Sequence, residues 1–140
     1  MQRWAVILVV GFVCGACSKA PERKATFPVT GIIKVDGQPV MDLAVRCHDT
    51  KGIDKTDPTE SAARTDAEGK FQISTYKTGD GVPVGDYVLT FTWGEVNLIS
   101  MQYSGDKFNG KYADAATSPH KFSVKEGVPT DSGTIELTTK

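Results

Sequence analysis

The sequence predicts a small all-β domain behind an apolar N-terminal segment, and three observations lead to that class. The chain has 140 residues, a length typical of one domain. Its 14 glycines and 7 prolines favour turns. Apolar and polar residues alternate at period two through much of the chain, without a long helical stripe. We therefore expect a seven-stranded antiparallel β-sandwich.

Composition argues against several classes of function. Lys and Arg total 16 against 17 Asp and Glu, so the chain has no bulk positive charge for nucleic acid. A turn-rich chain of this kind is also unlike a membrane bundle, a coiled coil or a nucleotide-binding α/β enzyme. We expect no nucleic-acid partner.

The N-terminus is expected to be an export signal that covers residues 1–16. Arg3 precedes a ten-residue run without charge at 4–13. As a helix such a run rises only about 15 Å, about half of the hydrocarbon thickness of a bilayer. A signal sequence therefore fits this segment better than a transmembrane span.

Cys17 is the predicted point of membrane attachment. The small residues before it resemble the bacterial lipoprotein signal, in which the cysteine is acylated and becomes the mature N-terminus. Cys14 occupies the position that is usually leucine, and the alternative is an ordinary secretory signal cut near Ala16. We expect a lipid on Cys17 and a polar tether at 17–26. The chain would then be anchored in the bacterial cell envelope, on the periplasmic or the outer surface.

The first four predicted strands follow this tether at 27–35, 41–47, 62–65 and 71–73. The first, second and fourth alternate apolar and polar residues, as half-buried strands do, whereas the segment at 62–65 is only a weak strand signal. Gly37 and Gly69 mark two of the turns between them. In the second strand we expect four side chains to point inward: Met41, Leu43, Val45 and Cys47.

Residues 86–93 show the clearest alternation in the chain, and two further strands are expected at 122–124 and 135–137. Tyr87 is expected to bury its ring and to reach a loop backbone with its hydroxyl. With the preceding strands this makes seven. Their predicted core consists of Phe71, Ile73, Leu89, Phe91, Ile135 and Leu137.

Four short motifs recur in order along the predicted strands and turns: VTG at 29–31, VDGQPV at 35–40, TDAEGKF at 65–71 and GDYVL at 85–89. They resemble motifs of carboxypeptidase regulatory-like domains. Their order is similar to that of small exported lipoproteins of planctomycete-type bacteria. The resemblance covers 27–139 and implies a transthyretin-like (prealbumin-like) β-sandwich domain at 27–140. It implies no catalytic residues.

No pattern indicates catalysis, so we expect no enzyme, no catalytic residues and no cofactor. Nothing in the sequence places His48 and His120 together or beside a nucleophile. The transthyretin-like fold also serves a hydrolase of 5-hydroxyisourate that ends in Tyr-Arg-Gly-Ser. This chain ends in Thr-Thr-Lys, which argues against that activity.

Binding of metal or sugar is weighed against structural roles. Cys47 is expected to be a buried thiol rather than a reactive one. The aromatic stripe at 87–93 suits a core more than a sugar groove. Acidic residues are dense enough to suggest calcium, but they lack the ligand spacing of an EF-hand, so we expect solvated acids and no metal site. They are Asp54, Asp57, Glu60, Asp66 and Glu68.

Residues 94–118 form a long connection with apolar side chains that are not at strand period. One interpretation is that they fold back over an open sheet edge. The other is that the tip at 104–111 exposes Phe108 between two lysines, as a surface for a partner. The possible interaction loop then comprises Tyr103, Lys107, Phe108, Lys111 and Tyr112.

These observations predict a membrane-tethered, non-catalytic binding or structural module of the cell envelope. Its partners would be the membrane, through the N-terminal lipid, and a protein or glycan of unknown identity. An envelope carbohydrate- or metal-binding protein is the alternative, and a hydrolase of the transthyretin-like class is the third possibility.

Overall fold

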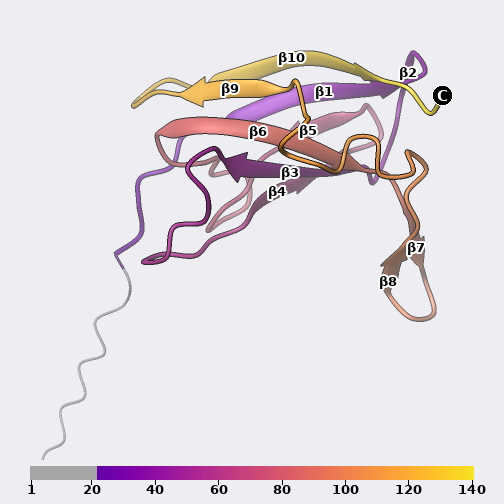
Figure 1. Cartoon of the computed structure of the whole chain (residues 1–140), viewed down its shortest axis with the longest axis horizontal. Coiled ribbons are helices and arrows are strands. Elements are labelled where there is room, and N and C mark those ends of the chain that lie inside the picture. Colours follow the sequence, from indigo (N-terminus) through magenta and orange to yellow (C-terminus); the bar gives the residue numbers. More distant parts are fainter. Residues whose placement is uncertain (1–21) are drawn as a thin grey trace, which may run out of the picture.

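The computed structural model describes residues 22–140, and within them the chain is all-β, as predicted. The expected export signal, Cys17 and the tether at 17–21 lie outside the described residues. The described residues form ten strands in three sheets (Figure 1). Across 22–140 the structure contains no helix long and apolar enough to span a bilayer.

The first four-stranded sheet is mixed. Its central strand β1 (Val29–Val35) pairs in parallel with β10 (Thr130–Leu137), and antiparallel with β2 (Gln38–Pro39) and β5 (Lys70–Gln72). The prediction of a wholly antiparallel fold is therefore wrong at the β1–β10 pair. An alternating pattern shows which side chains face the core, but it is the same for a parallel and an antiparallel partner.

The second four-stranded sheet is antiparallel, with the order β4 (Ser61–Arg64), β3 (Ala44–Asp49), β6 (Gly85–Thr92) and β9 (Lys121–Val124). A separate hairpin pairs β7 (Glu95–Asn97) with β8 (Gln102–Ser104) and projects away from both larger sheets in Figure 1.

The strand count of seven is wrong, because the described residues form ten. All seven expected segments do form strands, namely β1, β3, β4, β5, β6, β9 and β10. The additional strands β2, β7 and β8 have only two or three residues each, too few to show an alternating pattern.

The second expected strand begins later than predicted. Asp42 has φ of +60°, so the chain turns there, and β3 starts only at Ala44. Met41 is consequently 59% exposed rather than inward, whereas Leu43, Val45 and Cys47 are buried as expected.

One hydrophobic cluster draws buried side chains from both four-stranded sheets. All six predicted core residues are buried in it, which confirms that part of the prediction. Tyr87 is buried as well, and its hydroxyl donates a hydrogen bond of 2.9 Å to the Pro83 carbonyl, as expected.

The long connection covers the edge of β6 that β9 leaves open. β9 pairs with β6 only as far as Val88. Beyond that point, the Leu89 amide donates to the His120 carbonyl at 2.9 Å, and the Phe91 amide donates to the Tyr112 carbonyl at 2.9 Å. These bonds satisfy backbone groups that would otherwise form a free sheet edge. The interpretation in which the connection folds back over a sheet edge is confirmed.

Candidate functional site

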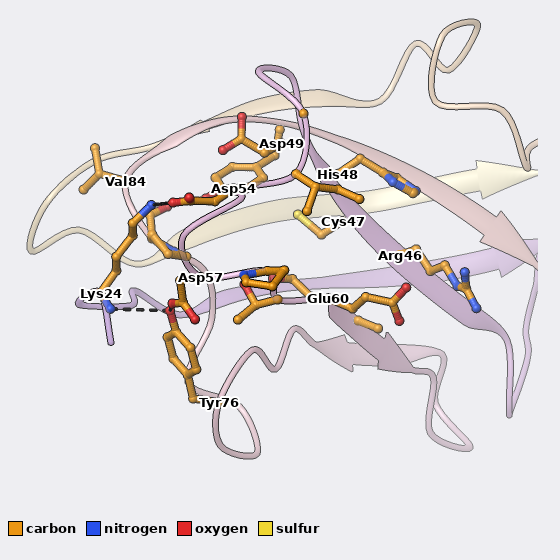
Figure 2. Close-up of a pocket in the computed structure, with 18 residues that line it drawn as sticks. Lys24, Arg46, Cys47, His48, Asp49, Asp54, Asp57, Glu60, Tyr76 and Val84 are labelled. Carbon is orange, nitrogen blue, oxygen red and sulfur yellow. Dashed lines mark hydrogen bonds and ion pairs between the residues drawn. The ribbon is translucent and has the colours of Figure 1, made fainter. Parts of the chain in front are cut away.

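A pocket of about 340 Å³ lies where β3 ends and the loop at 50–60 begins (Figure 2). The strand register places it, because Cys47 pairs with Ser61 of β4 and Asp49 pairs with Tyr87 of β6. The loop at 50–60 continues from the end of β3 along one side of the pocket. The walls of the pocket come from β3, this loop, the start of β4 and the segment before β6.

Lys24 closes one side of the pocket, although the sequence assigned this residue to the tether. Figure 2 shows its ammonium group paired with the Asp54 carboxylate. Its backbone amide donates to the Tyr76 hydroxyl at 3.4 Å, and that hydroxyl donates to Asp57. The Arg23 guanidinium also lies 5.3 Å from the centre of the Tyr76 ring. The N-terminal segment is therefore attached to the domain at this point.

Carboxylates outnumber cations in the lining by four to two. The hydrogen bond from Lys24 and those from Thr56 lower the pKa of Asp54, and the same bond raises the pKa of Lys24. The Asp54 carboxylate and the Lys24 ammonium group therefore stay ionised over a wide pH range. The acids are Asp49, Asp54, Asp57 and Glu60, and the cations are Lys24 and Arg46.

The apolar part of the pocket includes two exposed aliphatic side chains at its rim, Ile53 and Val84. Large aliphatic groups left in water beside a hollow are typical of binding sites. The pocket thus combines a negative lining with an apolar rim, which suits a ligand that carries a cation on an apolar body.

Cys47 borders this pocket but is 8% exposed. Burial, together with the negative charge of Asp49, raises the pKa of its thiol to about 12. Because the thiolate is the nucleophilic form, a thiol with such a pKa is a poor nucleophile at neutral pH. The prediction of a buried thiol is confirmed.

The structure does not bring the two histidines together. The His48 Nε2 atom lies 2.8 Å from the Thr90 hydroxyl, whereas His120 packs edge-on against Phe91 with 5.2 Å between ring centroids. Neighbouring residues of a strand point to opposite faces, so the two histidines contact opposite faces of β6. Burial lowers the pKa of His120.

The acidic residues considered for calcium divide into two groups. Asp54, Asp57 and Glu60 line the pocket, while Asp66 belongs to the turn before β5 and accepts hydrogen bonds from the Glu68 and Lys70 amides. Across residues 22–140, no cluster of three or more histidine, cysteine or acidic side chains is placed to hold a metal ion.

The predicted interaction loop does not expose Phe108. This side chain is 3% exposed and packs against Trp93 and Tyr112, at 6.0 and 5.0 Å between ring centroids. The hypothesis of an exposed Phe108 is therefore wrong, because the aromatic ring fills the core beneath the connection. Lys107 and Lys111 lie over the outer aromatic rings, 4.1 Å from that of Trp93 and 5.2 Å from that of Tyr112.

The remaining member of that loop, Tyr103, holds the base of the β7–β8 hairpin. Its hydroxyl donates to the Thr92 carbonyl at 2.9 Å and accepts from the Gly94 amide. In the aromatic stripe at 87–93, Tyr87, Leu89 and Phe91 are buried, as expected of a core, and Trp93 is half-buried.

Sequence reasoning missed the pocket, although one signal for it was present. The density of acids at 54–60 marked the loop, but nothing in the pattern indicated that Lys24 and Tyr76 face it. These residues are 30 and 22 positions away from Asp54 in the chain.

Comparison with family models finds none that matches the chain, and comparison with curated proteins finds no match either. Among solved structures, the chain is similar to the crystal structure of a 9R-lipoxygenase from Cyanothece PCC8801. The two are 15% identical with a TM-score of 0.40, over 81% of this chain and 16% of that chain. A likeness of this strength carries no argument about function.

Proposed function

We propose that the protein is an exported lipoprotein whose all-β domain is a non-catalytic binding module of the bacterial cell envelope. The observation that carries the binding role is the pocket at the end of β3, with its excess of carboxylates and its apolar rim. The protonated Cys47 thiol supports binding rather than nucleophilic chemistry there.

The proposed fold is a transthyretin-like β-sandwich of the carboxypeptidase regulatory-like kind. Two features support it: the motifs at 29–31, 35–40, 65–71 and 85–89, and the single hydrophobic cluster to which both four-stranded sheets contribute. In such a scaffold the strands supply rigidity and the loops at their ends supply recognition.

The proposed ligand carries an ammonium group on an apolar body. Its cation would approach Asp57 and Glu60, and its apolar part would cover Ile53 and Val84. A ligand with a carboxylate in place of the amine would meet the same acids and be repelled.

Binding is tested by titrating the full chain with alkylamines and with alkylcarboxylates of equal length, followed by NMR. We expect amines to shift the resonances of Ile53 and Val84, and carboxylates to leave them unchanged. Glu60→Gln should weaken amine binding, whereas Glu126→Gln, outside the pocket, should not. Equal responses to amine and carboxylate would contradict the proposed ligand class.

Membrane anchoring is tested separately with two cysteine variants. Cys17→Ser should release the protein from the membrane pellet, because no acyl chain is then attached. Cys14→Ser is the matched control and should stay in the pellet. If Cys17→Ser still pellets, and the wild-type protein shows no lipid mass, the anchor is not a lipid on Cys17.

A further inference from the structure

The tip of the β7–β8 hairpin exposes three large apolar side chains. Leu98 is 84% exposed, Ile99 97% and Met101 76%. The nine residues at 96–104 include no charged residue. In Figure 1 this hairpin stands clear of both four-stranded sheets, so the apolar groups lie at the end of a projection.

Local hydrogen bonds hold the turn in a conformation that keeps these groups in water. The Asn97 side-chain oxygen accepts from the Ile99 amide at 2.9 Å and from the Ser100 amide at 3.1 Å. Met101 adopts a positive φ of 54°, a conformation that costs free energy outside glycine. The exposure of Leu98 and Ile99 is therefore built into the turn.

Two cation–aromatic pairs lie at the base of the same hairpin. Arg64 lies 4.7 Å from the Tyr103 ring and Lys107 lies 4.1 Å from the Trp93 ring, while the Lys107 ammonium also lies 3.8 Å from the Glu95 carboxylate. The hairpin thus has an uncharged apolar end followed by a belt of Trp, Tyr, Lys and Arg that includes one acid, Glu95. That sequence of surfaces is typical of protein segments at a membrane–water interface.

We propose that the tip, residues 97–102, inserts into the interfacial region of a lipid bilayer. Leu98, Ile99 and Met101 enter the acyl boundary, and the basic belt contacts anionic headgroups. A narrow projecting turn suits insertion better than protein docking, because stable protein interfaces bury about 800 Å² on each partner.

In Figure 1 the first described residues lie at one end of the two four-stranded sheets, and the hairpin lies at the opposite end. The inference rests on the proposed function only for the presence of a membrane, and insertion of the tip does not require a lipid on Cys17.

A fluorescent probe at the tip tests the inference directly. In the full chain with Cys14→Ser and Cys17→Ser, the remaining Cys47 is buried, so an NBD label attached to Ile99→Cys reports the tip alone. The matched control carries the label at Val128→Cys, which is 52% exposed in the connection between β9 and β10. Both proteins are mixed with vesicles of phosphatidylcholine, with and without phosphatidylglycerol.

We expect the label at 99 to shift to shorter wavelength and to be quenched by nitroxide-labelled lipids, while the label at 128 remains unchanged. Phosphatidylglycerol should strengthen the response, and Arg64→Gln with Lys107→Gln should remove that gain. Equal behaviour of the two labels would overturn the inference. Protection of the tip by envelope proteins but not by vesicles would also overturn it, in favour of a protein partner.

A second pair of substitutions measures the contribution of the side chains. Leu98→Ser with Ile99→Ser should weaken vesicle partition of the Cys17→Ser chain by roughly a hundredfold, from the loss of two buried aliphatic groups. Unchanged thermal unfolding would show that the variant is folded. Unchanged partition would overturn the inference, while the presence or absence of a lipid mass on the wild-type protein decides the lipid anchor.

Discussion

The Ser118 hydroxyl donates a hydrogen bond of 2.6 Å to the carbonyl of Leu89 in the middle of β6. The same residue of β6 donates its amide to His120 at 2.9 Å. A side chain and a backbone group of the connection together take the place of a neighbouring strand. Ser118 is itself buried, so this bond is shielded from water.

Ser118→Ala should lower the free energy of unfolding by about 1–3 kcal/mol, because a buried carbonyl loses its donor. Chemical denaturation measures the change. Thr117→Ala, at the exposed neighbouring position, is the control and should stay within about 0.5 kcal/mol of wild type. Equal effects of the two substitutions would show that the buried bond does not stabilise the edge.

Phe108→Ala should lower the free energy of unfolding by about 3–5 kcal/mol, the usual cost of removing a buried aromatic ring. The ring lies between Trp93 and Tyr112, so its loss leaves a cavity beneath the connection. Leu98→Ala at the exposed hairpin tip should leave the unfolding transition unchanged. A stable Phe108→Ala protein would contradict the packing described for this loop.

Gly81→Ala should be far more damaging than Gly127→Ala. Both glycines have positive φ, +82° and +71°, so both substitutions carry the same kind of backbone strain. A Cβ at position 81 would lie 1.7 Å from the Phe27 carbonyl oxygen, whereas a Cβ at 127 meets no atom within 4 Å. Gly127→Ala should cost about 1 kcal/mol. Comparable thermal stability of the two variants would refute the steric argument.

Stability at alkaline pH should depend on Cys47. Its folded pKa is raised from 9.0 to about 12, so above pH 9 the unfolded chain releases a proton that the folded chain retains. Deprotonation then favours the unfolded state, and this residue removes up to about 1.4 kcal/mol of stability per pH unit between its two pKa values.

Urea unfolding of wild type and Cys47→Ala from pH 7 to 11 measures this effect. The difference between the two proteins should be constant below pH 8 and should move in favour of the variant above pH 9. Parallel profiles throughout would mean that the thiol titrates alike in both states.

The strands and the core could be predicted because a strand with one buried face alternates apolar and polar residues along its sequence. Phe71, Leu89 and Phe91 show this most clearly. The alternation is the same whether the partner strand runs parallel or antiparallel, so the parallel pairing of β1 with β10 was not predicted. The strands β7 and β8 were missed because three residues hold too little pattern.

The pocket could be predicted only in fragments. The acids at 54–60 were visible, but the partner of Asp54 is Lys24, a residue from a segment without apolar pattern. Contacts of this kind depend on how the loop folds over the end of β3. The burial of Phe108 was one of two alternatives, because the sequence pattern does not show whether an aromatic residue outside a strand faces the core or the solvent.

The pairing of β1 with β10 ties the assembly of the domain to its last strand. Val29 lies opposite Thr130 and Val35 opposite Leu137, so the first strand has its longest partner about a hundred residues later in the chain. During synthesis the edge of β1 that pairs with β10 therefore stays unpaired until nearly the whole domain has left the ribosome. Contacts so distant in sequence slow folding, and a chain that folds late stays extended for longer. In the proposed export, in which the chain passes through a translocation channel before it folds, this delay keeps the chain in the extended state that such a channel accepts.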